Sequence, residues 1–319
     1  MRDAKMPVPE PQSAGAILMV RPSRFAFNPE TAASNGFQSS AAQDAETSLA
    51  ALREFDGVAE GLAQAGVEVI VAEDSAAPLK PDAVFPNNWV SFHDEGVAVL
   101  YPLLAPNRRA ERREDIVALV AARGGFRILR TVDLSHREDE NKFLEGTGSL
   151  VLDRRHHLAY AALSPRTDLD VLGEFAQQMD YDLVAFDTAD ARGRAVYHTN
   201  VVMSIGSEFA VLCGAALGSP ASRQAVTAKL SATGHEVIDI TAAQMQCFAG
   251  NLLELAPSRG RVIALSSTAL RSFDAAQRGA LERCGTLLAF DIPVIERCGG
   301  GGVRCMLAEI HLPKRPRHD

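Results

Sequence analysis

A cysteine, Cys305, is the residue of this sequence best suited to chemistry, and it closely follows four consecutive glycines at positions 299–302. Glycine has no Cβ atom, so such a run can adopt positive φ angles and lets a ligand approach the backbone closely. The run MLAEI, which begins at Met306, is apolar enough to predict a buried strand. A thiol held between a flexible loop and a rigid strand is well placed to act as a nucleophile. Cysteine statistics alone favour a buried structural role, so the other polar residues must decide between the two.

A cluster of polar residues interrupts the apolar segment PDAVFPNNWV. Asp82 precedes Phe85, and the amides Asn87 and Asn88 stand directly before Trp89, the only tryptophan. Polar groups in a buried segment must find hydrogen-bond partners, either within the protein or on a ligand. The segment is therefore a candidate for substrate binding.

Two further stretches supply acid and base groups. Glu145 lies between Leu144 and a Gly-x-Gly turn in FLEGTGSLVLD, and His198 and Asn200 are two residues apart in VYHTNVVMSIG. If the second stretch is a strand, His198 and Asn200 project from the same face. Each signal alone is weak, because a lone histidine in a strand is more often a satisfied core residue. Together with Cys305, they supply a nucleophile, a proton carrier and an orienting carboxylate, which are the groups that covalent cleavage of a C–N bond requires.

The elements that must position these residues follow a repeated pattern of a short apolar strand, a turn of small residues with Ser and Pro, and an amphipathic helix. Such self-similarity is the signature of a repeated supersecondary unit. Units arranged around an axis bring the loops at one end together at a central site. The pattern recurs at 97–120, 158–175, 209–230 and 262–281, and the strand at 16–20 with the helix at 41–65 makes a fifth copy. That first helix is expected to place Leu49, Leu52, Phe55 and Leu62 on one face.

Composition and charge restrict the class of protein. The 319 residues carry a net charge of −8, which argues against a nucleic-acid-binding domain with its usual basic face. The basic runs at 108–113 and 314–317 are expected to be solvated surface. No window of about eighteen uninterrupted apolar residues occurs, so no membrane span is expected. Five cysteines without an export signal favour reduced thiols in the cytoplasm, and without Cys-x-x-Cys or spaced histidine pairs no metal site is expected.

The chain divides simply. We expect residues 1–15 to be a disordered lead-in, residues 16–312 to form a single catalytic domain, and residues 313–319 to be a basic tail. Two polar loops, 28–38 and 133–142, are candidates for a mobile lid over the site, and the sequence does not choose between them.

The combination of PDAVF, LEGTG, YHTN and GGGVRCM, in this order and across nearly the whole chain, resembles the guanidine-modifying superfamily of arginine deiminases, dimethylarginine dimethylaminohydrolases and amidinotransferases. This resemblance implies an α/β fold, the five-bladed α/β propeller called a pentein, with pseudo-fivefold ββαβ repeats around a central active site. MVRP, NPETA, QCFAGN and the HTN triplet are most similar to the bacterial citrulline hydrolase, or ureidase, branch.

The resemblance also implies catalytic roles, position by position. Cys305 matches the nucleophile that attacks the central carbon of a guanidine or urea group. His198 matches the general acid that protonates the departing amine and then activates water. Glu145 matches the carboxylate that orients His198. No cofactor or metal is implied, and the expected partner is a small amino-acid substrate.

Substrate-binding residues are implied in the same way. Asp82 matches an acid that holds the N–H groups of the substrate head. Arg166, in LSPRTD, matches an arginine that binds an amino-acid α-carboxylate, and Arg108, in APNRR, matches a second one less closely. The predicted substrate site is completed by Phe85, Asn87, Asn88 and Asn200.

Amides replace acidic residues of the superfamily at three places. Asn200 stands where arginine deiminases have an aspartate, and Asn87 and Asn88 stand where dimethylarginine hydrolases have acidic residues. Burying a cation without counter-charges is unfavourable, whereas a neutral urea needs hydrogen-bond donors and acceptors, which asparagine supplies. We therefore expect a ureido substrate, with citrulline hydrolysed to ornithine, ammonia and carbon dioxide.

Other functions remain open. Hydrolysis of arginine or a methylated arginine is the main alternative, because Asp82 is retained, and amidino transfer is a third. From a different class, the same propeller fold also serves as a non-catalytic binding protein, but that alternative predicts that the nucleophile and the histidine are absent. We expect no nucleic-acid or membrane partner, and the sequence leaves open whether the chain forms a homo-oligomer.

Overall fold

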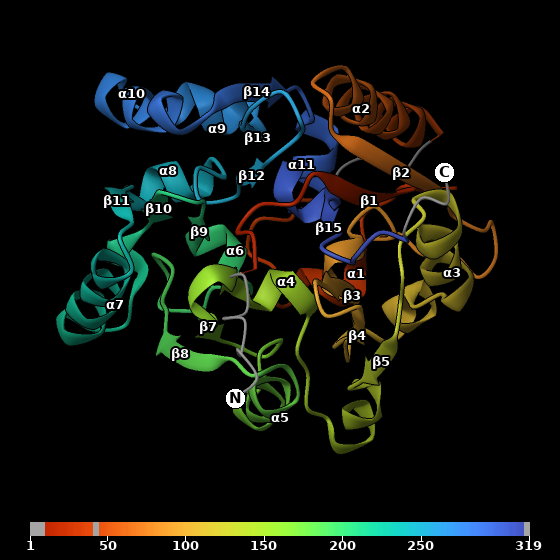
Figure 1. The fold of residues 1–319 in the computed structure, drawn as a ribbon, viewed down its shortest axis with the longest axis horizontal. Coiled ribbons are helices and arrows are strands. Elements are labelled where there is room, and N and C mark those ends of the chain that lie inside the picture. The colour runs from red at the N-terminus through yellow and green to blue at the C-terminus, as the bar shows by residue number, and fades with distance from the viewer. Residues whose placement is uncertain (1–9, 41–44, 316–319) are drawn as a thin grey trace, which may run out of the picture.

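Five three-stranded sheets form the frame of the protein. The computed structural model describes residues 10–40 and 45–315. The sheets lie around a common centre, with the longer helices on the outside (Figure 1). In every sheet the middle strand pairs antiparallel with one neighbour and parallel with the other. Within the described residues, no ladder joins the five sheets into one closed sheet.

The strands are short, and each sheet has its middle strand between two partners. In pairing order the sheets are β15 (Ala308–Glu309), β1 (Ala16–Arg21) and β2 (Glu68–Glu73); β3 (Val90–His93), β4 (Val97–Leu100) and β5 (Arg130–Asp133); β6 (Val151–Asp153), β7 (Leu158–Leu163) and β8 (Asp182–Asp187); β11 (Glu236–Asp239), β10 (Phe209–Leu212) and β9 (Met203–Ile205); and β12 (Leu253–Leu255), β13 (Val262–Ser266) and β14 (Thr286–Phe290).

Helices join the parallel pair of each sheet, as a parallel crossover requires. They are α2 (Ala45–Gln64), α3 (Glu114–Arg123), α5 (Leu169–Met179), α7 (Pro220–Ala232), and the successive α9 (Ser267–Ser272) and α10 (Ala275–Cys284). Shorter helices lie between the sheets, namely α4 (Gly146–Ser149), α6 (Thr199–Val202), α8 (Ala242–Gln246) and α11 (Pro293–Gly299), and the short α1 (Pro29–Ala32) precedes α2 between β1 and β2. Each predicted strand–turn–helix repeat contains the middle strand of one sheet and the helix that follows it.

Helix α2 shows how these helices are fixed to the frame. Its buried residues are Ala51, Phe55, Val58 and Leu62, spaced three and four apart on one helical face. Phe55 is 1% exposed, and burial of such a side chain contributes roughly 2–3 kcal/mol. Leu49, which we expected on this face, is 52% exposed, because two residues before Ala51 is a rotation of about 200° around the helix.

Two site residues lie in local structure that differs from the prediction. The stretch around His198 is not a strand, because His198 caps the short helix α6 and β9 begins only after it. Of the predicted strand MLAEI, only Ala308–Glu309 pairs as β15, and Cys305 lies in the 3-10 helix Val303–Met306. Both residues therefore lie in tight turns that precede a strand.

The described part of the expected N-terminal lead-in is ordered and buried. Glu10 is 5% exposed, and its carboxylate pairs with Arg154 Nη1 at 2.8 Å. Gln12 Nε2 donates to the carbonyl of Leu152 at 2.9 Å. The prediction of disorder is wrong for residues 10–15, because their polar side chains satisfy buried groups of the third sheet, and residues 1–9 lie outside the described residues.

The C-terminal segment is also attached where it is described. The backbone of Pro313 accepts from the N–H of Arg127 at 2.8 Å, and the N–H of Arg315 donates to Gly125 at 2.8 Å. Residues 313–315 of the expected basic tail thus pair with the loop that follows α3, whereas residues 316–319 lie outside the described residues.

The first sheet joins distant parts of the chain. Strand β15 pairs antiparallel with β1, so that Ala308 and Glu309 face Leu18 and Ile17. In the other four sheets all three strands follow one another along the chain. The first sheet is therefore complete only when residues from the two ends of the fold have met.

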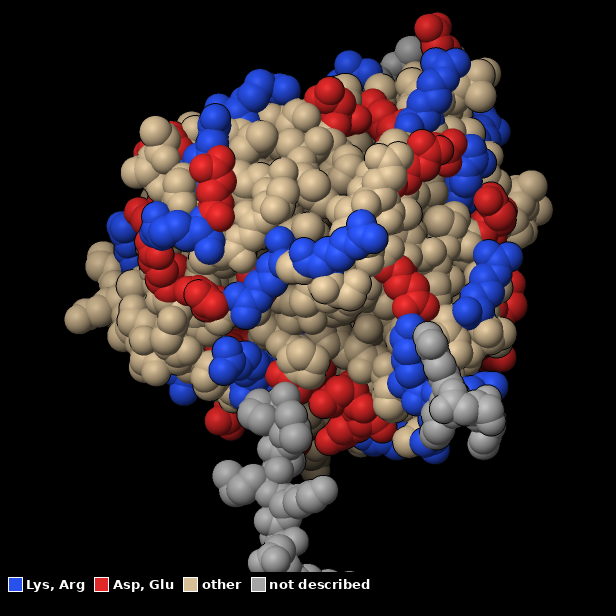
Figure 2. All heavy atoms as spheres, turned by 45° about the horizontal axis from the view of Figure 1, so that its top comes forward, with Lys and Arg blue, Asp and Glu red and all other residues tan. Residues whose placement is uncertain are grey.

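Charged side chains of both signs are interspersed around a wide uncharged area on the face shown in Figure 2. We expected the basic run at 108–113 to be solvated surface, but the structure shows that part of it is buried. Arg108 is 1% exposed, and Arg112 pairs with Glu138 at 2.5 Å, because buried carboxylates attract these side chains inward. No helix in the described part of the chain is long and apolar enough to cross a membrane.

Candidate active site

Seven of the ten predicted site residues line one small cavity. Its lining contains Asp82, Phe85, Asn88, Arg108, Arg166, His198 and Cys305, together with Thr31, Asn35, Tyr197 and residues 299–301. The volume is about 10 Å³, roughly the room of one water molecule. The remaining three, Asn87, Glu145 and Asn200, contact lining residues, and none of the ten is more than 4% exposed. Among the described residues no group of three or more His, Cys, Asp or Glu side chains is placed to hold a metal ion.

His198 is held by Glu145. Its Nε2 donates a hydrogen bond of 2.8 Å to Glu145 Oε2. Burial lowers the pKa of His198 to about 4, although the bond to Glu145 opposes this shift, so the imidazole is uncharged at neutral pH. Burial alone would raise the pKa of Glu145, but the Arg166 guanidinium and His198 outweigh it and hold that pKa well below its ordinary value. With Nε2 facing Glu145, Nδ1 is the nitrogen of His198 that can accept and return a proton.

Gly148 makes room for the imidazole. A Cβ atom at this position would lie 2.7 Å from His198 Nδ1 and 2.6 Å from Asn88 Nδ2. Both distances are far below van der Waals contact. The second glycine of LEGTG is therefore required by the packing of the site.

The Cys305 thiol lies between two side-chain amides. Asn251 Nδ2 is 3.2 Å from Sγ, and Asn200 Nδ2 is 3.6 Å from it. Burial raises the pKa of the thiol, and hydrogen bonding by Asn251, the charge of Arg304 and hydrogen bonding by Asn200 offset only part of this shift. Both shifts favour a protonated thiol and an uncharged imidazole at neutral pH.

Asp82 has one carboxylate oxygen that the protein leaves unused. Oδ2 accepts from Asn28 Nδ2 at 2.7 Å and from Thr31 Oγ1 at 3.3 Å, and Arg108 Nε lies 3.7 Å away. Oδ1 is buried and has no hydrogen-bond partner among the described residues. A buried acceptor without a donor is unfavourable by about 1–3 kcal/mol, so this oxygen is suited to an N–H group of a ligand.

All three nitrogens of the Arg166 guanidinium already donate hydrogen bonds to the protein. Nη1 contacts Glu145 Oε2 at 3.1 Å, and Nε and Nη2 donate to Ser34 Oγ at 3.0 and 2.8 Å. Nη2 also donates to the carbonyl of Thr31 at 3.0 Å, and the guanidinium lies 5.0 Å from the ring centre of Tyr197. A substrate carboxylate would have to replace Ser34 and Thr31 at this fork.

Arg108 has a dedicated counter-charge. Its Nε and Nη2 donate to the two oxygens of Glu111 at 3.0 and 2.8 Å, and its Nη1 donates to Asn88 Oδ1 at 2.9 Å. Because Glu111 already occupies one edge of the guanidinium, a substrate carboxylate at Arg108 would have to compete with a buried carboxylate.

Residues 28–38 cover the cavity, and we call them the lid segment. Asn28 and Thr31 bind Asp82, and Ser34 binds Arg166, as described above. Asn35 Nδ2 donates to the carbonyl of Gly300 at 3.3 Å. The second candidate loop, 133–142, lies instead against α5, where Arg137 pairs with Glu174 at 2.6 Å. Of the two loops, the lid segment is the one that closes the site.

Three neighbours of the site were missed in the sequence. Asn251, beside Cys305, belongs to the QCFAGN motif that we used only as a mark of resemblance. Tyr197 donates to the carbonyl of Gly300 at 2.6 Å, and it precedes His198 in YHTN. Glu111 lies three residues after Arg108, a spacing typical of an intrahelical ion pair and therefore a signal that was available.

Several known structures share this fold. Unliganded AgrE matches with a TM-score of 0.72 and 17% identity over 95% of this chain. The substrate-bound N-terminal domain of a variant of ArgZ, an arginine dihydrolase from the ornithine–ammonia cycle in cyanobacteria, matches with 0.70 and 15% over 92% of this chain and 97% of that one. A dimethylarginine dimethylaminohydrolase variant, in an adduct with S-methyl-L-thiocitrulline, matches with 0.64 and 13% over 93% and 100%. This chain spans only 40% of the length of the AgrE chain.

The α/β fold is therefore similar to that of the pentein enzymes of the guanidine-modifying superfamily. Residues 21–312 match the family described as N,N dimethylarginine dimethylhydrolase, eukaryotic, and the chain belongs to this family. The enzymes of this family act on guanidino C–N bonds. A comparison with curated protein sequences found no match.

Proposed function

We propose that this chain is a cysteine-dependent hydrolase that cleaves a C–N bond of a ureido or guanidino amino acid, with citrulline as the preferred substrate. One observation carries the proposal. Cys305 and His198 line the same buried cavity, Glu145 holds the histidine at 2.8 Å, and Asp82 presents an acceptor without a donor.

In this mechanism, Cys305 forms the first bond. Substrate binding lets the thiol proton pass to His198 Nδ1, and Glu145 stabilises the imidazolium through Nε2. The thiolate attacks the ureido carbon, and the π electrons of the carbonyl move to its oxygen. The tetrahedral intermediate collapses when His198 protonates the departing ornithine nitrogen, which leaves an S-carbamoyl cysteine.

Water completes the cycle. The uncharged His198 removes a proton from water, and the hydroxide attacks the thiocarbamate carbon. The C–S bond breaks, the thiolate recovers the proton through His198, and carbamic acid decomposes to ammonia and carbon dioxide. Release of ammonia before ornithine is the other possible order, and it uses the same groups.

The amides beside the thiol support a neutral substrate head. Asn200 and Asn251, whose side chains hydrogen-bond the thiol of Cys305, carry no charge that could serve as the counter-charge of a cation. The buried acids Asp82, Glu111 and Glu145 already pair with Arg108 and Arg166. A ureido group can donate an N–H to Asp82 Oδ1 without adding a charge that needs its own counter-charge.

Arginine is the second candidate substrate. A guanidinium N–H would also suit the unpartnered oxygen of Asp82, and AgrE has been crystallised as a variant with L-arginine. Arginine deiminase, dimethylarginine hydrolase and amidinotransferase activities would all use the same nucleophile and histidine.

We also infer that the five sheets are the blades of a pseudo-fivefold propeller and that residues 16–312 are one catalytic domain. Supporting this, every sheet repeats the same order of an antiparallel and a parallel pair. The five cysteines are unpaired, which fits a reducing compartment such as the cytoplasm.

A parallel assay tests the proposal. The purified protein is incubated separately with citrulline, arginine and asymmetric dimethylarginine, and ornithine, citrulline and ammonia are quantified. Ornithine from citrulline is expected at the highest kcat/KM. Rapid formation of citrulline from arginine would be consistent with the proposed catalytic residues but would contradict the preference for a ureido substrate. No turnover of any of the three compounds would refute the proposed function.

A further inference from the structure

A second, much larger cavity lies on the outer side of the lid segment. Its volume is about 560 Å³, against about 10 Å³ for the cavity around Cys305. Ser34, Gly36 and Phe37 of the lid segment form part of its wall. Tyr197 lines both cavities, so the two share a wall. We call them the outer and the inner cavity.

Ser34, a lid residue in the wall of the outer cavity, contacts the guanidinium of Arg166. Ser34 lines the outer cavity, and its hydroxyl accepts both hydrogen bonds from Arg166 Nε and Nη2. Arg166 itself lines the inner cavity. A displacement of the lid segment that moves Ser34 would therefore open the outer cavity to the guanidinium of Arg166.

The outer cavity carries an excess positive charge. Asp190, Arg192 and Arg194 come from the loop between β8 and α6. Asp190 accepts from the backbone N–H groups of Arg192 and Arg194 at 2.8 and 2.9 Å, and it pairs with the guanidinium of Arg194 at 2.8 Å. The guanidinium of Arg192 has no ion pair or hydrogen bond within the described part of the chain. One cationic group is thus available to a ligand.

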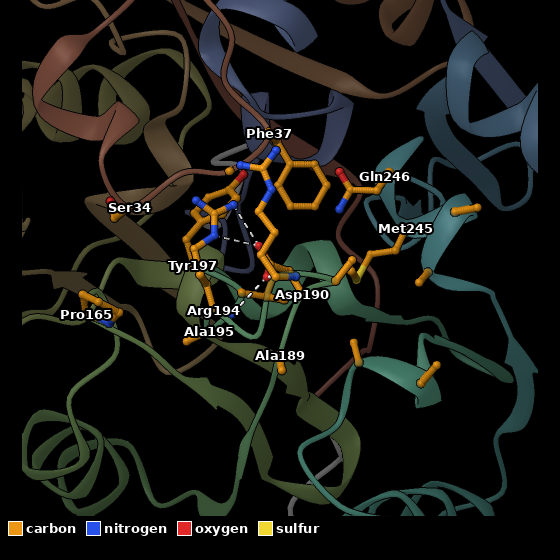
Figure 3. A pocket seen from close by; sticks show the side chains of 18 of the residues that line it. Ser34, Phe37, Pro165, Ala189, Asp190, Arg194, Ala195, Tyr197, Met245 and Gln246 are labelled. Carbon is orange, nitrogen blue, oxygen red and sulfur yellow. Dashed lines mark hydrogen bonds and ion pairs between the residues drawn. The ribbon is translucent and has the colours of Figure 1, made fainter.

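The rest of the lining is small and mainly apolar. Figure 3 shows Arg194 and Tyr197 on one side of the cavity and Met245 and Gln246 on the other. Most of the other lining residues are alanines, among them Ala189, Ala195 and Ala216. An apolar floor with one cationic edge is suited to a compact molecule that has an aliphatic chain and a carboxylate, such as a free amino acid.

We infer that the outer cavity is the docking site where an amino-acid substrate first binds, with its carboxylate on Arg192, before the lid segment opens. The identity of the ligand as an amino acid rests on the proposed function. The inner cavity has room for about one water molecule, so a substrate must first bind outside the closed lid segment.

A ligand in the outer cavity would lie against the part that must move. Arg194 Nη2 is 2.5 Å from the position that a Cβ atom of Gly36 would take, so the arginine-bearing loop touches the lid backbone. Phe37 packs on Tyr197 with their ring centres 5.9 Å apart. A ligand docked in the outer cavity would therefore contact residues that must move when the lid segment opens.

The test compares two alkylating reagents of similar size, iodoacetate and iodoacetamide, which differ in their carboxylate. Both form an S–C bond to the Cys305 thiolate and expel iodide. The rate constant for each reagent is obtained by mass spectrometry of the peptide that contains Cys305, for the wild-type chain and for Arg192→Glu. The matched control is Arg53→Glu, because Arg53 is an exposed arginine of α2 that also has no ion pair among the described residues.

Charge reversal at the docking site should act on one reagent only. Arg192→Glu should slow iodoacetate about tenfold and leave iodoacetamide unchanged, since only the first carries the charge that Arg192 attracts. Arg53→Glu should change neither rate. Equal iodoacetate rates in the wild type and Arg192→Glu, or equal slowing of both reagents, would overturn the inference.

Narrowing the cavity provides a second measurement. Ala243→Phe, at an exposed position of the outer cavity, should slow both reagents at least about fivefold, because both must pass through it. Unchanged rates would show that access to Cys305 lies elsewhere. Alkylation requires only the thiol, so a lack of turnover with any amino acid would refute the proposed function and still leave the two rates to decide the docking site.

Discussion

Replacement of Glu145 by glutamine should slow turnover roughly thousandfold while leaving the nucleophile in place. Glutamine keeps the size of the side chain and can still accept the 2.8 Å bond from His198 Nε2, but it removes the negative charge beside the imidazole. Two unit charges about 4 Å apart interact by about 4 kcal/mol at an effective dielectric constant near 20. Because about 1.4 kcal/mol is a factor of ten, loss of this stabilisation of the imidazolium corresponds to about three powers of ten in kcat.

The same substitution has two further consequences. Glu145 raises the pKa of His198, so its removal should lower that pKa further and make the imidazolium harder to form. Arg166 and Arg108 would also lose a buried counter-charge at 3.1 and 3.7 Å, which should lower the free energy of unfolding by about 3–5 kcal/mol. Stability must therefore be measured beside activity.

The assay is steady-state turnover of whichever amino acid the wild-type chain hydrolyses, with urea unfolding of the same preparations. Glu138→Gln is the matched control, since Glu138 is a largely buried carboxylate that pairs with Arg109 at 3.2 Å and Arg112 at 2.5 Å outside the cavity. It should lose stability but keep kcat within about twofold. The reasoning fails if Glu145→Gln retains more than a tenth of wild-type kcat, or if the control loses kcat equally.

Four other predictions follow from the same geometry. Cys305→Ser should abolish turnover with an unchanged melting temperature, and retained activity would mean that another thiol is the nucleophile. Gly148→Ala should lower kcat/KM about a hundredfold by displacing the imidazole, whereas Gly173→Ala, where a Cβ atom meets nothing within 4 Å, should leave kinetics unchanged. Asn251→Ala should raise the pH midpoint of iodoacetamide alkylation, because this amide lowers the thiol pKa, and a downward shift would contradict its role. The pKa of His198 is about 4 in the folded protein and 6.5 ordinarily, so its contribution to stability is present above pH 6.5 and is lost as the pH falls to 4. Over this interval the free energy of unfolding of the wild type, measured in urea, should fall by about 3 kcal/mol relative to that of His198→Asn. Parallel plots of unfolding free energy against pH for the two proteins would contradict this prediction.

The chemistry of the site was more predictable from the sequence than its geometry. The thiol, the histidine and the carboxylate were recognisable because polar residues interrupt apolar segments, and burial of unpaired polar groups has a high free-energy cost. The pairing of Glu145 with His198 joins residues 53 positions apart, and no local pattern encodes such a distance. Only the resemblance to known enzymes supplied it.

The failures have a common cause in tertiary contacts. The strand expected around His198 is replaced by a turn, because this segment must meet Ser149 and Ala162 through the hydroxyl of Thr199. Residues 10–15 looked disordered because they are polar, yet Glu10 finds a buried arginine, Arg154. Local composition predicts how a segment interacts with water. It does not reveal which buried side chain from a distant part of the chain the segment will contact.

The pairing of β15 with β1 has a consequence for how the protein is made. A ribosome releases β1 early, and this strand must wait, with one edge unpaired, while nearly all the rest of the chain is translated. Cys305 lies only three residues before β15, so the proposed nucleophile can reach Asn200 and Asn251 only when this part of the chain has been translated. Under the proposed mechanism, the nascent chain carries its histidine and carboxylate long before its nucleophile, and catalysis begins only after translation has passed the last strand of the fold.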